Sequence, residues 1–304
     1  MNYNLITILG PTASGKTTLA THIAQTLGSG VISADSRQVY KQMDIGTGKD
    51  LGDYKINNNP IPYYLIDICN AGEKYNVYEF QKDFIKVFSG FAEKNVVPVL
   101  CGGSGLYIEA VLMGYRMLSV PINEILRNEL SLKSDNELSN ILANLKKLHN
   151  TTDITTKKRL IRAIEIEQYQ KDNKINSPDF PNIKSLIVGI NFERNELKQR
   201  ITQRLKTRLE SGMIEEVRTL LESGIFPEDL IYYGLEYKFI TLYLTNQLSY
   251  TDMISQLNIA IHQFSKRQMT WFRKMEREGF KIQWIDGNLS LTNQINKVLE
   301  LFNQ

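Results

Sequence analysis

Residues 10–17 constrain the fold more than any other part of the sequence. They read GPTASGKT and match the phosphate-binding pattern G-x-x-x-x-G-K-[ST], with the apolar run 5–9 before them and a helical pattern after them. A loop of this kind directs backbone N–H groups at phosphate oxygens, Lys16 adds a positive charge, and the Thr17 hydroxyl can bind Mg²⁺. The stretch therefore predicts a strand, a diphosphate-binding loop and a helix, but it leaves the reaction open.

The pattern around this loop predicts an α/β fold. Short apolar runs alternate with helical patterns, and a Cys-Gly-Gly turn stops the last of the early runs. The predicted strands are 5–9, 31–33, 61–67, 96–100 and 185–192, and the predicted helices between them are 17–27, 77–93 and 104–113. Strands that alternate with helices indicate a doubly wound parallel sheet, here a P-loop NTPase-like core, which binds ligands at the carboxyl ends of its strands.

The middle of the chain has a different composition and hydrophobic periodicity. No strand pattern occurs between about residue 118 and residue 184, where helical segments are rich in Asn, Lys and Glu. We therefore predict an inserted helical subdomain at 118–184 within a core formed by 1–117 and 185–304. Beyond residue 193 the pattern predicts one long basic helix to about Ser223 and then only helices to the end.

The amino-acid composition excludes several classes of protein. The 304 residues are 42% apolar, enough for a large core, and contain only Cys69 and Cys101, too few for a disulfide framework or a Cys-rich zinc site. No apolar run approaches 18 residues and no signal peptide is visible, so we expect a cytosolic protein without a membrane partner. Basic residues gather in three segments, near 157–162, 194–208 and 266–277. Each could be a solvated helix face, but together they suggest a polyanionic partner.

A polar group follows the second strand. Asp35 and Ser36 lie where a doubly wound sheet binds ligands, so Asp35 could accept a proton, hold Mg²⁺ indirectly, or cap the next helix. Arg37 and Gln38 add donors suited to a phosphate or a base edge. The strand at 96–100 ends in Cys-Gly-Gly, where many P-loop NTPases carry an acidic residue. Glycines there suit the close approach of a ligand or of another chain segment.

Several motifs together resemble one known family. In order, GPTASGKTTLA, ISADSRQVYKQMDIGTGK, VPVLCGGSGLYIEAVLMG, RITQRLKTRLESGMIEEVRTL and SKRQMTWFRK resemble the motifs of bacterial tRNA dimethylallyltransferases, also called tRNA isopentenyltransferases. The resemblance covers nearly the whole chain. It implies transfer of a dimethylallyl group from dimethylallyl diphosphate to the exocyclic amine of the adenosine 3′-adjacent to the tRNA anticodon, with release of diphosphate. The implied partners are dimethylallyl diphosphate and the tRNA anticodon stem-loop. We expect a monomer.

The resemblance also assigns roles to residues. Asp35 would be the general base, and Thr12 and Arg204 would act on the diphosphate with Mg²⁺ held by Thr17. The implied diphosphate-binding residues are Gly10, Pro11, Thr12, Ala13, Ser14, Gly15, Lys16 and Thr17. The implied tRNA-binding residues are Asp35, Ser36, Arg37, Gln38, Ser104, Arg127, Lys158, Arg159, Leu160, Ile161 and Arg162. In the basic helix, Arg200, Arg204 and Arg208 share one face, which could line the diphosphate pocket or the tRNA path.

The sequence departs from the family pattern at a few places. Residues 233–237 read YGLEY where the family has Gly-Tyr-basic-Glu, and His262 stands at a position that is often arginine. Trp271 and Phe272 are expected in the core more than in a base-stacking platform. Two other functions stay open at this point. A P-loop kinase of a small metabolite or nucleotide would use the same loop, and a non-catalytic tRNA-binding protein could keep the same fold.

Overall fold

The computed structural model describes residues 3–115, 117–145, 156–173 and 180–304. The chain divides into two compact units. We call residues 1–114 with 181–304 the core unit and residues 115–180 the helical unit. The composition and periodicity of the sequence predict boundaries at 118 and 184. The boundaries in the structure lie three and four residues before these.

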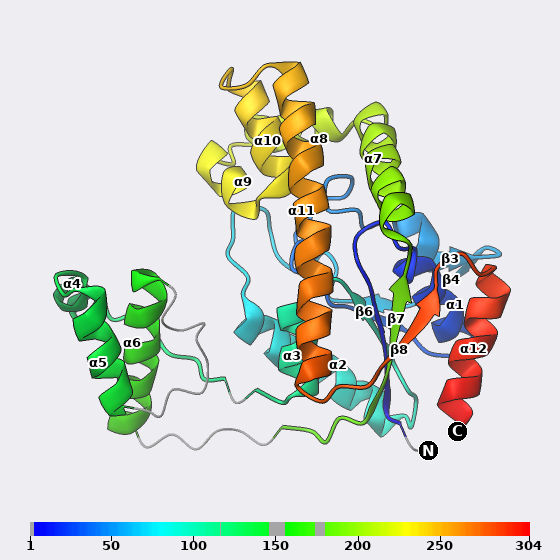
Figure 1. Cartoon of the computed structure of the whole chain (residues 1–304), viewed down its shortest axis with the longest axis horizontal. Coiled ribbons are helices and arrows are strands. Elements are labelled where there is room, and N and C mark those ends of the chain that lie inside the picture. Colours follow the sequence, from blue (N-terminus) through cyan, green and yellow to red (C-terminus); the bar gives the residue numbers. More distant parts are fainter. Residues whose placement is uncertain (1–2, 116, 146–155, 174–179) are drawn as a thin grey trace. The chain divides into compact units, whose positions relative to one another are not determined.

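The core unit contains a six-stranded sheet in the order β5-β2-β6-β1-β7-β8, and every pairing between neighbours is parallel. The strands are β1 (Leu5–Leu9), β2 (Val31–Ser33), β5 (Tyr63–Tyr64), β6 (Val99–Gly102), β7 (Ser185–Asn191) and β8 (Ile282–Asp286). Between β2 and β5, the chain forms a short helix η1 (Leu51–Tyr54) and a hairpin of β3 (Lys55–Ile56) and β4 (Asn59–Pro60). The predicted doubly wound parallel sheet is confirmed, and the carboxyl ends of its strands share one edge (Figure 1).

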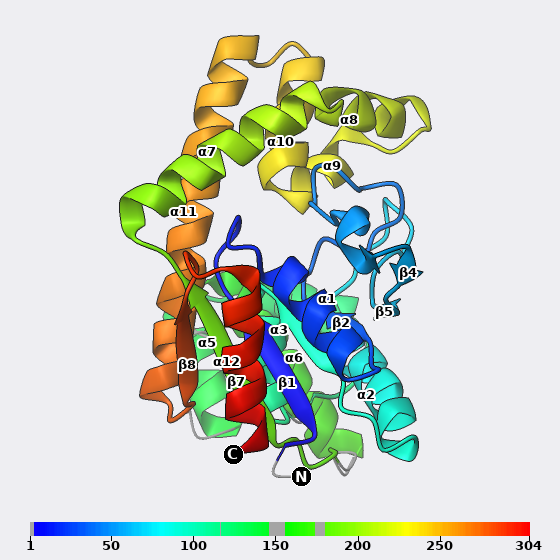
Figure 2. The same cartoon turned by 90° about the vertical axis from the view of Figure 1, so that its right-hand side faces the viewer.

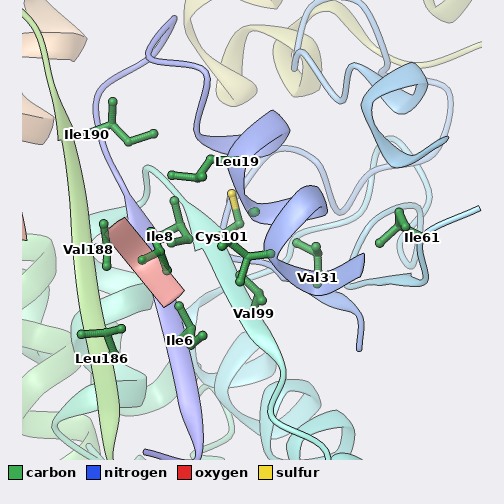
Figure 3. Packing of buried hydrophobic residues seen from close by; sticks show 14 of the residues in the cluster. Ile6, Ile8, Leu19, Val31, Ile61, Val99, Cys101, Leu186, Val188 and Ile190 are labelled. Atoms are coloured by element: carbon green, nitrogen blue, oxygen red, sulfur yellow. The ribbon is translucent and has the colours of Figure 1, made fainter. Parts of the chain in front are cut away.

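Helices cover both faces of the sheet (Figure 2). All five residues of β1 are buried, and successive side chains of a strand point to opposite faces. The strand therefore contributes side chains to two hydrophobic cores, one on each face of the sheet. Ile6 and Ile8 pack with α1 (Lys16–Thr26) and α12 (Leu291–Asn303), as Figure 3 shows for part of this cluster. Leu5 and Leu9 pack with the other helices, which are α2 (Val77–Glu93), α3 (Gly105–Leu112) and the end of α11 (Tyr250–Arg277). Phe272 belongs to this second core, as predicted, and is fully buried.

A third cluster of buried side chains joins the helices that follow β7. They are α7 (Arg194–Glu210), α8 (Met213–Glu222), α9 (Pro227–Tyr233), α10 (Leu235–Leu244) and the first half of α11. The prediction of one helix to about Ser223 is wrong, because the chain breaks between α7 and α8 at Gly212. This residue has φ +97°, in the left-handed region where glycine carries no steric penalty.

The expectation of only helices after residue 193 is also wrong at β8, which pairs with β7 at the edge of the sheet. In β8 only Ile282 and Ile285 are buried, and the half-buried Trp284 lies between them. That spacing fits a helix as well as an edge strand, so the pattern alone does not distinguish the two.

The helical unit consists, in its described part, of α4 (Glu124–Ser131), α5 (Asp135–Leu145) and α6 (Lys157–Asn173). Leucines from all three helices and Ile164 form its core. Next to that core the buried carboxylate of Glu165 accepts hydrogen bonds from the backbone N–H of Asn123 at 2.7 Å and from the guanidinium groups of Arg127 and Arg162. Across the described residues, the helices are too short or too polar to cross a membrane.

Candidate functional site

The loop between β1 and α1 has the shape of an anion cradle. Ala13 and Gly15 take left-handed φ angles of 63° and 76°, and α1 begins directly at Lys16 with its first N–H groups unpaired within the helix. The buried hydroxyl of Ser14 has no hydrogen-bond partner among the described residues. The structure thus places together all the residues for which the sequence predicts diphosphate binding. They are Gly10, Pro11, Thr12, Ala13, Ser14, Gly15, Lys16 and Thr17.

Gln268 of α11 fixes this loop to the neighbouring strand end. Its Oε1 accepts from the backbone N–H of Thr12 at 2.8 Å, and its Nε2 donates to the carbonyl of Gly103 at 3.0 Å. A Cβ on Gly103 would lie 2.2 Å from that Nε2, and one on Gly102 would lie 2.2 Å from the carbonyl oxygen of Ala34. The glycines after β6 therefore permit the close approach of other chain segments, one of the two uses that the sequence suggests.

The arginines of α7 face the loop. Arg200 Nε donates to the carbonyl of Ala13 at 3.0 Å, and Arg204 Nη1 donates to the Thr12 hydroxyl at 3.1 Å. Arg204 Nη2 and Arg208 Nη2 lie 2.5 and 3.5 Å from one oxygen of Asp50. The basic face of α7 therefore borders the loop, and its contact with a diphosphate or with tRNA stays a prediction.

Asp35 lies just beyond the end of β2 and is half-buried. Its Oδ1 accepts from the backbone N–H of Arg37 at 2.9 Å, so one oxygen closes a local turn. Asp35 does not cap a helix, because the next helix in the described chain, η1, begins at Leu51. The carboxylate also lines the same cavity as the loop residues Thr12 and Lys16. A group held by one oxygen at a cavity wall can still accept a proton from a ligand.

The other polar residues after β2 have three different sets of partners. The Ser104 hydroxyl accepts from the backbone N–H of Ser36 at 3.0 Å. Arg37 lies 5.8 Å from the ring centroids of both Tyr232 and Tyr233. The Gln38 amide is used internally, because its Oε1 accepts from Ser33 at 2.8 Å and its Nε2 donates to the Gly48 carbonyl at 3.0 Å. Gln38 thus shapes the cavity wall, and its predicted tRNA contact stays a prediction.

A cavity of about 340 Å³ brings these groups together. The loop supplies Thr12, Lys16 and Thr17, the end of β2 supplies Asp35, and α7 supplies Arg204. Residues 233–237, where the sequence departs from the family pattern, form part of the same wall. A second hollow of about 650 Å³ on the loop shares Lys16, Thr17 and Arg204 and adds Asp50 and Asp53.

Burial shifts the pKa of several groups in the cavity. It lowers the pKa of Lys16 and raises that of Glu236, and it raises the pKa of the Cys101 thiol to about 12. A thiol with so high a pKa remains protonated at neutral pH and is a poor nucleophile. Cys101 therefore acts as an apolar wall residue at the position where many P-loop NTPases carry an acid.

The described residues contain no cluster of three or more His, Cys, Asp or Glu side chains that could hold a metal ion. Mg²⁺ rarely requires such a cluster, because it is commonly bound by one or two protein oxygens, substrate phosphates and waters. The Thr17 hydroxyl at the start of α1 lines both cavities and fits that kind of site.

The tRNA-binding residues predicted in the helical unit fall into two groups. Lys158 and Arg159 are exposed at the start of α6 and Ile161 is half-buried. Leu160 is only 1% exposed, because it packs in the core of the unit, and Arg127 and Arg162 pair with Glu165. Leu160, Arg127 and Arg162 thus have the surroundings of structural residues, and the tRNA contacts of both groups stay predictions.

Sequence reasoning missed three residues that build the site. Gln268 lies inside a quoted family motif, yet a glutamine on a helix gives no signal of its own. Glu216 of α8 accepts from the backbone N–H groups of residues 44–46 at 2.6 to 3.0 Å and from the Tyr237 hydroxyl at 2.6 Å. Asp50 contacts Arg204 and Arg208 across 154 and 158 residues of sequence. Such long-range pairs leave no local pattern.

Two family models and two curated relatives agree on one family. A family model described as IPP transferase matches residues 38–275, and one described as isopentenyl transferase matches residues 3–59. The chain is 56% identical to tRNA dimethylallyltransferase 1 of Parabacteroides distasonis, covering 99% of this chain and 98% of the relative. It is 59% identical to tRNA dimethylallyltransferase 1 of Azobacteroides pseudotrichonymphae, covering 99% and 97%.

A solved structure agrees with these sequence matches. The crystal structure of the tRNA isopentenylpyrophosphate transferase of Bacillus halodurans superposes with a TM-score of 0.71 at 29% identity, covering 99% of this chain and 96% of that one. The family model spans more than half of the chain, and the curated relatives span nearly all of it. With its phosphate-binding sequence pattern, its carboxylate at the cavity wall and its arginine face, the chain belongs to the IPP transferase family.

Proposed function

We propose that this protein transfers a dimethylallyl group from dimethylallyl diphosphate to the exocyclic amine of the adenosine 3′-adjacent to the anticodon of tRNA. The observation that carries the proposal is the shared cavity, in which Asp35 lines one wall and the loop residues Thr12, Lys16 and Thr17 line another. A diphosphate cradle and a carboxylate in one chamber suit a reaction in which a diphosphate leaves while an amine loses a proton.

The chemistry divides between these groups. The bond between the dimethylallyl carbon and the diphosphate oxygen breaks, and a bond from that carbon to the amine nitrogen forms. The loop N–H groups, Lys16 and Arg204 stabilise the negative charge that grows on the leaving diphosphate. The proton of the amine passes to the free oxygen of Asp35, while its other oxygen stays bonded to Arg37.

Mg²⁺ is part of the proposal. The Thr17 hydroxyl would hold it, and a bound Mg²⁺ would neutralise charge on the diphosphate. A monomeric enzyme is also part of the proposal. The anticodon stem-loop is the proposed RNA partner because the adenosine must leave its stack to enter the cavity, and unstacking is easiest in a single-stranded loop.

A kinase is the alternative that the phosphate-binding loop allows. In that reading Asp35 would activate an acceptor hydroxyl and the loop would hold ATP. The strand β6 ends at Gly102 without an acidic side chain, and relatives that match almost the full chain are named tRNA dimethylallyltransferases. We therefore do not propose a kinase.

The test uses unmodified tRNA and dimethylallyl diphosphate labelled in its dimethylallyl group. We expect label retained in tRNA and diphosphate released in equal amounts, and a parallel reaction with ATP shows no turnover. A tRNA with guanosine in place of that adenosine is the matched control and should retain no label. Turnover of ATP without tRNA, and no label in tRNA, would overturn the proposal.

A further inference from the structure

Two arginines of the diphosphate pocket already have an anionic partner. Arg204 Nη2 lies 2.5 Å and Arg208 Nη2 lies 3.5 Å from Asp50 Oδ2, while Arg204 Nη1 donates to Thr12 of the loop. Arg204 therefore spans Asp50 and the phosphate-binding loop. We call Arg204 and Arg208 the arginine pair.

The segment that carries Asp50 is anchored on several sides. The Glu216 carboxylate accepts from the backbone N–H groups of residues 44–46. Lys49 is fully buried, donates to the Tyr40 carbonyl at 2.7 Å, and pairs with Asp44 and Asp67. Gly48 leaves no space, because a Cβ there would lie 1.7 Å from Arg208 Nη2. These contacts hold the backbone before Asp50, so we expect an entering anion to move side chains more than backbone.

The Asp50 carboxylate does not serve its own helix. Asp50 precedes η1, a position where aspartate normally accepts from the first N–H groups, yet its side chain makes no such bond. Its φ of +46° lies in the left-handed region and directs the side chain away from that role. Burial opposes its ionisation, but the arginine pair outweighs burial and lowers the pKa of Asp50. The carboxylate is charged at neutral pH and faces the arginines.

The leaving diphosphate would lie in the hollow of about 650 Å³ described above. Asp50, Arg204 and the loop residues from Ala13 to Thr18 line it together. A diphosphate on the loop and the Asp50 carboxylate would both seek the arginine pair, and they would repel each other across the hollow. Resting on the proposed function, we infer that Asp50 is an internal counter-ion that competes with the diphosphate for the arginine pair and so promotes its release after transfer.

The test compares Asp50→Asn with the unchanged protein. Asparagine tolerates a left-handed φ, so the backbone should be kept, and the variant removes the charge alone. We expect inorganic pyrophosphate, titrated with Mg²⁺ by calorimetry, to bind about fivefold tighter, as expected when a competing ion pair worth about 1 kcal/mol is lost. Steady-state transfer should also fall relative to single-turnover transfer, because product release becomes slower.

Asp53→Asn is the matched control. Asp53 lines the same hollow, but among the described residues it forms no salt bridge with Arg204 or Arg208, and it accepts from the Thr18 hydroxyl at 3.0 Å. If Asp53→Asn tightened pyrophosphate binding as much as Asp50→Asn does, the cause would be general repulsion between carboxylates and the anion. That result would overturn the inference. Unchanged or weaker pyrophosphate binding by Asp50→Asn would also overturn it. If the unchanged protein transferred no label to tRNA, the proposed function would fail, while the pyrophosphate titration would still judge the counter-ion.

Discussion

In the core unit Arg204 and Arg208 meet a carboxylate that is 47% exposed at a cavity, whereas in the helical unit Arg127 and Arg162 meet one that is only 2% exposed. An arginine whose partner faces solvent can exchange that partner for a ligand. An arginine that neutralises a buried carboxylate cannot leave it without a large loss of stability. The burial of the partner, and not the residue type, thus distinguishes a ligand-binding arginine from a structural one.

The sharpest test of this comparison replaces one arginine of each kind. Arg204→Ala should lower the kcat/KM for dimethylallyl transfer by about 10³-fold, the scale for losing one donor to developing negative charge. It should leave the unfolding temperature nearly unchanged, because its ion pair is partly exposed. Arg127→Ala should instead lower that temperature clearly. The comparison fails if thermal denaturation shows equal destabilisation by both variants.

The second test concerns the carboxylate at the cavity wall. Asp35→Asn should lower the rate of transfer by about 10²-fold, because a general base is lost while the bond to the Arg37 N–H can persist. Binding of tRNA, measured by filter retention, should stay within a factor of about two. Single-turnover kinetics with saturating tRNA report the chemical step. A variant that transfers at the full rate would remove Asp35 from that role.

The sequence predicts the parts of this site that a local pattern encodes. The loop at 10–17, the strand before it and the parallel sheet that places Asp35 at the carboxyl ends of its strands all follow from spacing and periodicity, and the structure has them. Gln268, Glu216 and Asp50 could not be predicted, because each acts through a partner more than 100 residues away. The strand β8 was missed for a different reason, since its buried residues also fit a helical period.

The third test concerns the buried carboxylate of the helical unit. Burial disfavours the charge of Glu165, but hydrogen bonds from Arg127, Asn123 and Arg162 outweigh it and lower its pKa from 4.5 to about 2. Glu165→Gln should lower the free energy of unfolding by about 3 kcal/mol at neutral pH, the scale for breaking a buried ion pair. Urea denaturation followed by circular dichroism measures the difference between the two proteins.

The pH dependence of that difference has a defined sign. A depressed pKa stabilises the folded state above about pH 4.5, and this contribution is lost as the pH falls toward 2. The two proteins should therefore differ most near neutral pH and converge in acid. Glu137→Gln is the control, because Glu137 is fully exposed and bonds only within its own turn, to Ser134. A difference between wild type and Glu165→Gln that persists unchanged at pH 2 would contradict the assignment.

The smallest expected effect belongs to the exposed end of α6. Lys158 is exposed, and it is one of the residues for which the family resemblance implies contact with tRNA. If it contacts a phosphate, Lys158→Ala should weaken tRNA binding by a few-fold and reduce the slope of log affinity against log salt by about 0.7 to 0.9. Stability should not change, because an exposed lysine forms no part of the core.

Lys171→Ala, at the other end of the same helix, is the matched control for charge. Equal salt slopes in both variants would mean that Lys158 adds only net charge. A smaller slope in Lys158→Ala alone would show that the helical unit has ligand-binding cations as well as structural ones, and that the two kinds lie within four residues of each other on α6.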